Sequence, residues 1–289
     1  LQVIPLLILV SLISFFIIRL SPVDPLAELR LNPSISQETL SKEMKRLKLD
    51  KPIYIQYASW AKSFVQGDLG YTSAGEKVST KLKERIPNTL LLTSIVIFMT
   101  WIVGIPLGIL AAIKKETAFD RILTVISSVG MAIPSFFFAI LMSFCGKIMD
   151  LSKHLVLPVI VLFTISLSGL QRQMRANMLE VLDSDYVKFA RAKGLSENKV
   201  IFKHALRNAI NPMITLLGFE FAGLLSGAAL TEYVFQFPGL GRLILEAVMK
   251  SDINLVMASL MMGTIMLILG NLIADILLMI ADPRIRASR

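Results

Sequence analysis

Six long apolar runs dominate the sequence, five of them without charged side chains and one with a single glutamate, and their length constrains the fold more than any other feature. A helix needs roughly 20 apolar residues to cross a bilayer core of about 30 Å. Hydrophobic residues make up 54% of the 289 residues, which is too many for a soluble protein of this size. We therefore predict an all-α polytopic membrane protein in which residues 1–289 form a single domain. The six predicted transmembrane helices are 1–18, 86–113, 122–146, 155–171, 208–231 (interrupted by Glu220) and 253–274.

The basic residues between these runs predict which side of the membrane each loop occupies. Excess Lys and Arg in short loops marks the cytoplasmic side. Such residues follow the second, fourth and sixth spans, which places both termini in the cytoplasm. Segment 21–85 is predicted to lie outside. Its own basic residues do not contradict this position, since loops longer than about 60 residues largely escape the rule. The net charge of +9 follows this pattern, so it does not indicate nucleic acid binding. The residues concerned are Lys114, Lys115, Arg121, Arg172, Arg175, Arg284, Arg286 and Arg289.

One charged stretch, from Ser184 to Pro212, separates the fourth span from the fifth. We predict that it is a structured connector within a cytoplasmic segment, 172–211, and that it forms two short helices joined at Gly194. Ser184 and Ser196 are suitable N-caps, and Pro212 disfavours helix at the residue before it. A helical knob between two spans suits a membrane subunit on which a separate soluble protein acts. A basic stripe is expected on the second helix, at Lys199, Lys203 and Arg207.

The outer segment is predicted to contain two helices, at about 36–49 and 53–65. They form either a folded cap over the outer mouth or a lone amphipathic surface helix, and the pattern leaves both open. A further amphipathic piece, 242–250, precedes the last span on the same side. Pro106 and Pro134 should kink the second and third spans or loosen their hydrogen bonding.

No catalytic residue, metal ligand or cofactor site is predicted. The phosphate-binding pattern G-x-x-x-x-G-K-[ST] is absent from the sequence, so ATP hydrolysis by that route is not expected. The two histidines have no metal-like neighbourhood. Cys145 is the single cysteine, which excludes an intrachain disulfide and a cysteine metal site. Because the sequence starts at Leu1 without a methionine, we expect the true N-terminus to precede it.

Glu220 is the one charged residue inside the fifth apolar run. It lies eight residues after Pro212, about 12 Å along a helix. An ionisable side chain at that depth faces a cavity or a partner by default. Two interpretations stay open: Glu220 lines a translocation path, or it makes an interhelical hydrogen bond.

The connector resembles the cytoplasmic signature of bacterial ABC-importer permeases, and more narrowly the B-type permeases of oligopeptide, dipeptide and nickel importers. The general pattern of such permeases, E-A-A-x3-G, is kept only at Ala190 and Gly194, since Lys188 and Phe189 fill its first two positions. The pattern of the peptide and nickel branch is matched by Asp185-Tyr186-Val187, by Ala190 to Ser196, by His204 to Ala209 and by Pro212. The resemblance extends to Arg19 to Pro25, Leu49 to Pro52, Gly104 to Gly108, Thr231-Glu232, Phe237 to Gly241 and Asp282 to Arg286. One departure is the loop between the third and fourth spans, which is usually longer and here comprises only about 147–153.

The resemblance implies a type I ABC-importer permease of the bacterial cytoplasmic (inner) membrane that forms half of a translocation path. A second related permease, two cytoplasmic ATPase subunits and an extracytoplasmic substrate-binding protein would complete the importer. The connector would dock in a groove of one ATPase, with Leu195 filling an apolar hollow there. The implied ATPase-coupling residues are Asp185, Tyr186, Ala190, Arg191, Ala192, Lys193, Gly194, Leu195 and Ser196.

Two other classes of membrane protein are alternatives to the importer subunit. An ion-coupled secondary transporter would work without an ATPase, and such folds usually have more spans, with inverted repeats. A membrane anchor or scaffold would lay its basic connector on anionic lipid. The sequence does not identify the substrate, since peptides, nickel complexes and glutathione-like compounds all use this scaffold.

Overall fold

The computed structural model describes residues 3–20, 50–148 and 155–281, together with a few isolated positions between 30 and 44. The predicted C-terminal arginines, most of the predicted helix 36–49 and most of the loop 147–153 lie outside the described residues. Within the described ranges the regular elements are helices, and the strand-like pairing found there is one isolated bridge between Tyr71 and Lys77. The prediction of an all-α protein is confirmed.

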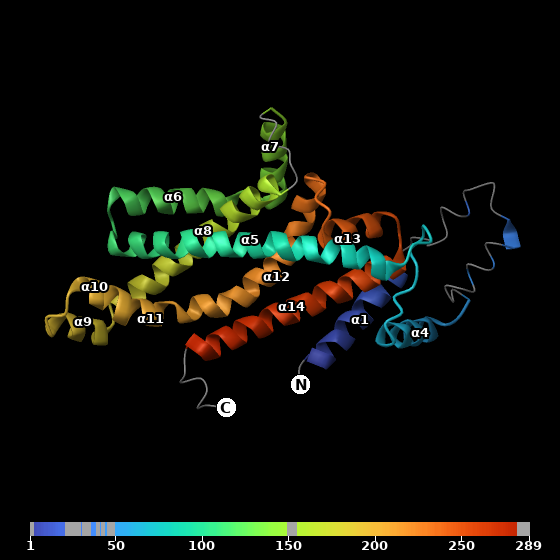
Figure 1. The fold of residues 1–289 in the computed structure, drawn as a ribbon, viewed down its shortest axis with the longest axis horizontal. Coiled ribbons are helices and arrows are strands. Elements are labelled where there is room, and N and C mark those ends of the chain that lie inside the picture. The colour runs from blue at the N-terminus through green and yellow to red at the C-terminus, as the bar shows by residue number, and fades with distance from the viewer. Residues whose placement is uncertain are drawn as a thin grey trace. The chain divides into compact units, whose positions relative to one another are not determined.

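Four helices within the described ranges are long and apolar enough to cross a membrane (Figure 1). A fifth span is formed if the bent pair α6 (Ala118–Ala132) and α7 (Ser135–Ile148) crosses as one unit. The remaining predicted run coincides with α12 (Asn211–Val234), a helix of 24 residues. Six spans therefore stay a prediction. The four helices are α1 (Val3–Leu20), α5 (Val78–Ile113), α8 (Val156–Leu182) and α14 (Ile253–Ala281).

Two of these helices extend well beyond the apolar runs that predicted them. Helix α5 has 36 residues, about 54 Å at 1.5 Å per residue, whereas the apolar run starts only at residue 86. Helix α8 continues past residue 171 to Leu182. The added segments are rich in Lys, Arg, Glu, Gln and Met, which favour helix as strongly as Leu does. The end of an apolar run therefore marks a change of polarity and not the end of the helix.

The third predicted span is broken at Pro134. Helices α6 and α7 meet there at 96°. Ile133 has an extended backbone, with φ −82° and ψ 121°, as expected for a residue that precedes proline. Pro106, by contrast, lies inside α5, which continues through it. The predicted effect is thus confirmed at Pro134 as a complete break in the helix.

Contacts divide the chain into two compact units, 1–88 with 238–266 and 89–237 with 267–289. In the first unit α4 (Ile53–Val65) has the predicted bounds and packs against α1. Tyr57 hydrogen-bonds to Ser11 at 2.9 Å, and its ring lies 5.4 Å from that of Phe15. Helix α4 therefore packs on α1 through aromatic side chains, although none of its own residues is buried, and the choice between a cap and a surface helix stays a prediction.

Asp252 ties the loop after α4 to the start of α14 within the same unit. One of its carboxylate oxygens accepts from the backbone N–H of Ser73 at 2.6 Å, and the other accepts from the N–H of Leu255 at 3.0 Å. The second bond is an N-cap for α14. Asn254 adds a hydrogen bond to the carbonyl of Tyr71 at 3.0 Å. The segment that follows α13 (Leu240–Met249), predicted to lie outside, is thus brought into contact with the first outer segment.

The second unit contains an apolar cluster between α5, α8, the connector and α12. Helices α5 and α8 approach closely at Gly108, where a Cβ would lie 2.6 Å from the Cβ of Met174. A larger side chain at position 108 would push the two helices apart, which explains the glycine in the Gly104 to Gly108 motif. The buried members of the cluster are Ile109, Ala112, Leu170, Met174, Met178, Val187, Ala190, Val200, Ile201, Ala205, Ala209 and Met213.

Candidate functional site

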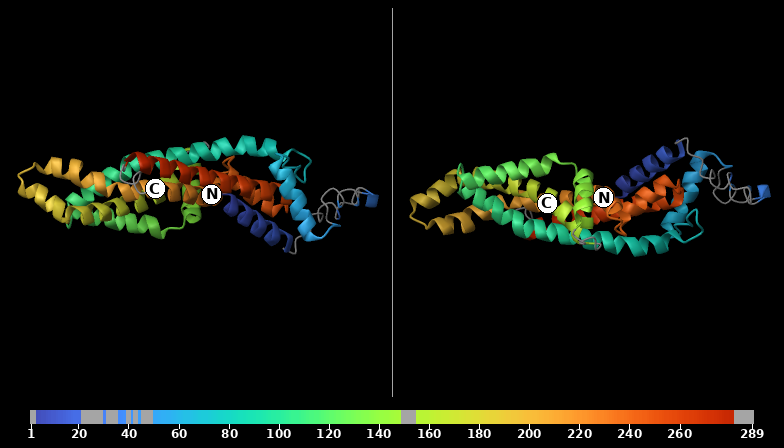
Figure 2. Two further views of the ribbon diagram at one scale, coloured as in Figure 1. Left: turned by 90° about the horizontal axis from the view of Figure 1, so that it is seen from below. Right: turned by 90° about the horizontal axis from the view of Figure 1, so that it is seen from above.

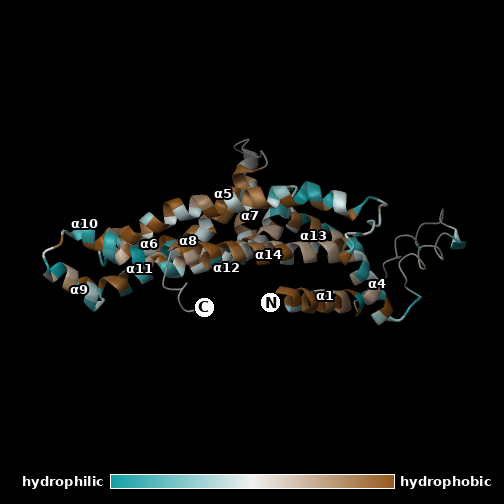
Figure 3. Ribbon diagram, turned by 60° about the horizontal axis from the view of Figure 1, so that its bottom comes forward, coloured by the Kyte–Doolittle hydropathy of each residue, from teal (hydrophilic) through white to brown (hydrophobic). Residues whose placement is uncertain are grey.

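The connector folds as two helical pieces at the ends of α8 and α12, in all the views of Figures 1 and 2. The first is α9 (Asp185–Ala192). The second runs through α10 (Glu197–Lys199), the π-helical turn η1 (Val200–Ala205) and α11 (Leu206–Ala209). Figure 3 shows polar residues concentrated on these pieces, in contrast to the apolar α1 and α14. The two-helix prediction is confirmed, with a π-helical segment that the sequence did not reveal.

The serines at the starts of both pieces occupy the N-cap position without capping through their side chains. Ser184 has the extended backbone of an N-cap, and its carbonyl accepts from the N–H groups of Val187 and Lys188, both at 3.1 Å. Its hydroxyl instead donates to the carbonyl of Val181 at 2.5 Å, at the end of α8. Ser196 likewise makes no side-chain cap bond. The predicted cap positions are right, and the predicted side-chain bonds are wrong.

Gly194 adopts the left-handed conformation that joins the two pieces. Its φ is +74°, and its N–H donates to the carbonyl of Arg191 at 2.9 Å. A Cβ at this position would meet no heavy atom within 4 Å. The glycine is therefore required by its backbone conformation and not by lack of space.

One face of the connector is buried against the apolar cluster. Val187 and Ala190 on α9 are 0% and 7% exposed, and Leu195 is half-buried against the same cluster. Leu195 therefore makes apolar contacts within its own chain. Part of the Leu195 surface is therefore already covered by its own chain, and only the remaining part is free to fill a hollow in an ATPase.

The opposite face of the connector exposes large apolar side chains among basic ones. Tyr186 is 45% exposed, Phe189 61% and Phe202 58%. The Lys193 ammonium lies 4.7 Å from the centre of the Phe189 ring, and Asn208 donates to the Tyr186 hydroxyl at 2.7 Å. Lys199, Lys203 and Arg207 are exposed as predicted. We call Tyr186, Phe189, Lys193 and Phe202 the outer face of the connector.

An ion pair closes the turn at Gly194. Arg191 Nη2 donates to Glu197 Oε1 at 2.8 Å, and its Nε lies 3.2 Å from both carboxylate oxygens. These hydrogen bonds lower the pKa of Glu197 and raise that of Arg191. Both side chains are substantially exposed, at 39% and 56%, so the pair contributes at most about 1 kcal/mol. Its role is to fix the angle between the two pieces of the connector.

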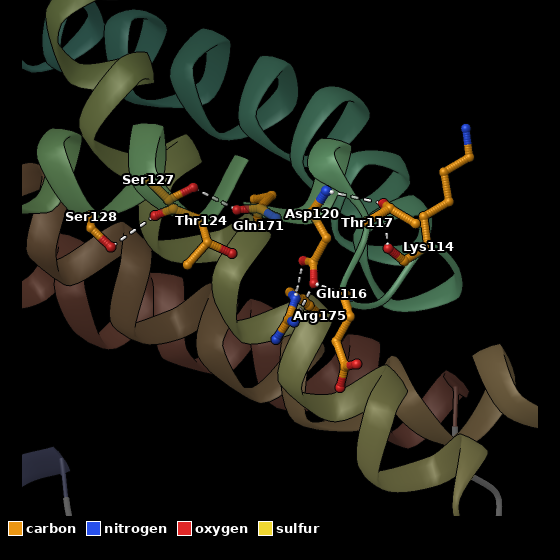
Figure 4. Close-up of polar contacts among 9 residues, drawn as sticks. All are labelled: Lys114, Glu116, Thr117, Asp120, Thr124, Ser127, Ser128, Gln171 and Arg175. Carbon is orange, nitrogen blue, oxygen red and sulfur yellow. Dashed lines mark hydrogen bonds and ion pairs between the residues drawn. The ribbon is translucent and has the colours of Figure 1, made fainter. Parts of the chain in front are cut away.

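A bidentate ion pair that the sequence did not predict joins α6 to α8 (Figure 4). Arg175 donates through Nε and Nη2 to the two oxygens of Asp120, at 2.5 and 2.6 Å. Asp120 also accepts from the backbone N–H of Glu116 at 3.0 Å. The Asp120 side chain is 5% exposed and that of Arg175 26%. The predicted topology places both residues on one side of the membrane, but they are 55 positions apart in the sequence, and their spacing does not reveal the pairing.

Glu220 makes the interhelical hydrogen bond that one of its two interpretations requires. The indole N–H of Trp101 on α5 donates to Glu220 Oε2 on α12 at 2.9 Å. Trp101 also lines a groove of about 380 Å³ between α5, α12 and the C-terminal part of α14. The other lining residues are Ser94, Ile97, Phe98, Leu217, Phe221, Gly270 and Ile273. Glu220 itself is half-buried.

A second acidic residue of α12, Glu232, lies in the Thr231-Glu232 motif near the C-terminal end of the helix and is completely buried. It accepts from the Thr89 hydroxyl at 2.8 Å, and its carbonyl accepts from the N–H of Phe237 at 2.8 Å. These bonds hold the C-terminal end of α12 against α5 and fix the start of the following loop. The motif is therefore structural in this chain.

Comparison with known families places these features in context. The model of the binding-protein-dependent transport system inner membrane component matches residues 104–287, and the N-terminal model of the same membrane component matches residues 1–93. The chain belongs to this family. Its members are transport proteins, and the comparisons give no support to a secondary transporter or to a membrane anchor.

Curated relatives of this permease match it over almost its whole length. The oligopeptide transport system permease protein AppB of Bacillus subtilis (strain 168) is 37% identical, with 98% of this chain and 96% of AppB covered. The dipeptide transport system permease protein DppB of Escherichia coli (strain K12) is 33% identical, with 98% and 96% covered. The resemblance to the peptide branch of the family is thus confirmed.

A solved structure supports the type I permease fold. A chain in the inward-facing structure of the MetNI methionine ABC transporter superposes with a TM-score of 0.63 at 18% identity. The match covers 70% of this permease and 96% of that chain. At this identity the likeness concerns the fold alone.

Proposed function

We propose that this permease forms half of the translocation path of an ATP-driven importer for peptides or a related small solute. The substrate class rests on the relatives, which are named for oligopeptide, dipeptide and di/tripeptide transport. The proposed complex contains a second related permease, two cytoplasmic ATPase subunits and an extracytoplasmic substrate-binding protein. ATP hydrolysis takes place in the ATPase subunits.

The connector is the observation that carries this proposal. Its inner face is buried in the apolar cluster, so a force on the connector reaches α8 and α12 through packed side chains. Its outer face offers exposed aromatic rings beside the ammonium of Lys193. An ATPase groove with apolar walls and acidic residues at its rim is complementary to this face. Only an ATPase that binds the connector differently in two states can drive transport.

The predicted coupling residues divide into two groups according to their exposure. Asp185, Tyr186, Arg191, Ala192, Lys193, Gly194 and Ser196 are exposed and available to an ATPase. Ala190 is buried and Leu195 half-buried, so we propose that these two hold the connector in shape. The contact itself falls to the exposed group, together with Phe189.

We further propose that both termini and the connector lie in the cytoplasm of a bacterium. The Asp120–Arg175 contact supports one part of this topology, because it joins the first turn of α6, next to the loop after α5, to the C-terminal part of α8. The contacts of Asp252 support another part, since they join two segments predicted to lie outside.

Purification and uptake assays test the proposed function. The permease, produced with its partner permease and the two ATPases, should co-purify as one complex. Vesicles containing that complex and the binding protein should accumulate a radiolabelled dipeptide only with ATP. ATP-dependent uptake of another solute and not of peptides would overturn the substrate class. Uptake driven by an ion gradient without any ATPase would overturn the proposal as a whole.

A further inference from the structure

The loop between α5 and α6 is held by the Asp120 carboxylate. Asp120 accepts three hydrogen bonds, two from Arg175 and one from the backbone N–H of Glu116. Glu116 has a φ of +66°, a conformation that residues other than glycine seldom adopt. Figure 4 shows the guanidinium of Arg175 and the N–H of Glu116 converging on this one side chain. The Asp120 carboxylate therefore joins the shape of the loop to the ion pair with Arg175.

A second polar contact joins α6 to α8 further along the two helices. Ser127 donates to Gln171 Oε1 at 2.6 Å, with both side chains buried. Asp120 and Ser127 are two helical turns apart on α6, while Arg175 and Gln171 are one turn apart on α8. Two contacts along the helices prevent α6 from sliding or rotating on α8 without breaking one of them.

The opposite side of α8 is joined to the connector. Asn177 donates to the carbonyl of Ala209 at 3.4 Å and lies 3.3 Å from the sulfur of Met213. Met174 and Met178 of α8, both 0% exposed, pack in the apolar cluster with the buried face of α9. Helix α8 thus contacts α6 through two directional polar contacts, and it contacts the connector through the Asn177 hydrogen bond and close packing.

We propose that Asp120 and Arg175 are positioning residues that make α6, its preceding loop and the connector move as one rigid body with α8. This inference rests on the proposed coupling of the connector to an ATPase. A bidentate pair fixes both distance and orientation, whereas apolar packing alone tolerates sliding. When the ATPases displace the connector, α6 and the loop before it then follow the same displacement.

Distance measurements across this body provide the test. Spin labels at Lys115→Cys, in the loop, and Asn198→Cys, on the connector, are introduced in a Cys145→Ala background. Both native side chains are exposed. In the full complex we expect one narrow distance distribution that is the same without nucleotide and with trapped ATP. A distance that changes between these states in the wild type would overturn the rigid-body proposal.

The variant Asp120→Asn removes the negative charge, and Arg175→Lys removes the guanidinium that donates two hydrogen bonds. Both keep the approximate size of the side chain. For both we expect a broader or shifted distribution with ATP and roughly a tenfold loss of peptide uptake per ATP hydrolysed, with normal assembly. Glu76→Gln is the matched control, because it breaks the 2.5 Å ion pair with Lys81 elsewhere in the chain; it should match the wild type. A changed distance with normal uptake, or lost uptake with an unchanged distance, would each overturn the inference. If connector variants such as Gly194→Val still uncouple the complex, the proposed function survives that failure.

Discussion

At the scale of single residues, three positions show how the surroundings decide what a side chain does. Gly194 is required because its backbone adopts the left-handed conformation, although there is room for a side chain there. Gly108 is required because two helices approach closely there. Glu232 lies in a recognisable motif, and its complete burial and its bond to Thr89 make it structural. Residue type alone does not distinguish these roles.

Substitutions at Gly194 should follow backbone preference and not side-chain volume. A left-handed conformation costs most residues about 1–2 kcal/mol, and asparagine tolerates it best. We expect Gly194→Asn to keep most of the peptide-stimulated ATP hydrolysis, and Gly194→Val to abolish it along with uptake. Both proteins should insert normally. Equal loss in the two variants would mean that position 194 makes a direct contact that any side chain blocks.

Glu220 is proposed to line the translocation path, and its bond to Trp101 provides a matched control. Glu220→Gln keeps an acceptor for the indole N–H and removes the charge, so uptake should fall while assembly with the partner permease and the ATPases stays normal. Glu220→Leu should impair uptake more, since it also removes the hydrogen bond. Trp101→Phe removes the bond and leaves the carboxylate.

The comparison of these three variants separates the two interpretations of Glu220. If Glu220→Leu and Trp101→Phe both fail to assemble, the hydrogen bond is structural and the role in the path is wrong. Normal uptake by Glu220→Gln would also contradict that role. Size-exclusion chromatography of the complex and dipeptide uptake in vesicles supply the two measurements.

At the scale of elements, the sequence predicted what each segment is better than where it ends. The bounds of α4 were predicted correctly because turn-forming or polar residues flank an amphipathic run. The ends of α5 and α8 were not, because charged helix-forming residues continue both helices. The break at Pro134 followed from the chemistry of proline, whereas nothing in the sequence indicated the π-helical turn at Val200–Ala205.

The two faces of the connector predict opposite consequences for the same substitution. Leu195→Asp would place a carboxylate against an apolar cluster, at a cost of about 1–3 kcal/mol, and should expose the connector to trypsin. Phe189→Asp changes a side chain that is 61% exposed. It should leave trypsin resistance unchanged and weaken binding to the ATPase by roughly tenfold.

Limited proteolysis and binding of the purified ATPase measure these two effects separately. A trypsin-resistant Leu195→Asp variant that no longer binds the ATPase would show that Leu195 fills a hollow in the partner after all. Full ATPase binding by Phe189→Asp would remove the outer face from the docking surface.

At the scale of the whole molecule, the class of protein and the site segment were predictable, and the contacts between distant segments were not. Apolar runs identified a helical membrane protein, and the residues from Asp185 to Pro212 indicated the family. The Asp120–Arg175 pair joins residues 55 positions apart, and Asp252 reaches a backbone N–H 179 positions away. Pairings of this kind depend on how the helices pack, which composition and spacing do not encode.

Accessibility of two engineered cysteines to an impermeant thiol reagent tests the central claim most directly. Ser73 and Ser196 are both exposed and are replaced singly by cysteine in a Cys145→Ala background. We predict that Ser73→Cys reacts only from the extracytoplasmic side of the membrane and that Ser196→Cys reacts only from the cytoplasmic side. Assembly with the ATPases should then protect Ser196→Cys and leave Ser73→Cys reactive. Labelling of both cysteines from one face would contradict the topology, and a Ser196→Cys that stays fully reactive in the assembled complex would contradict docking of the ATPase on the connector.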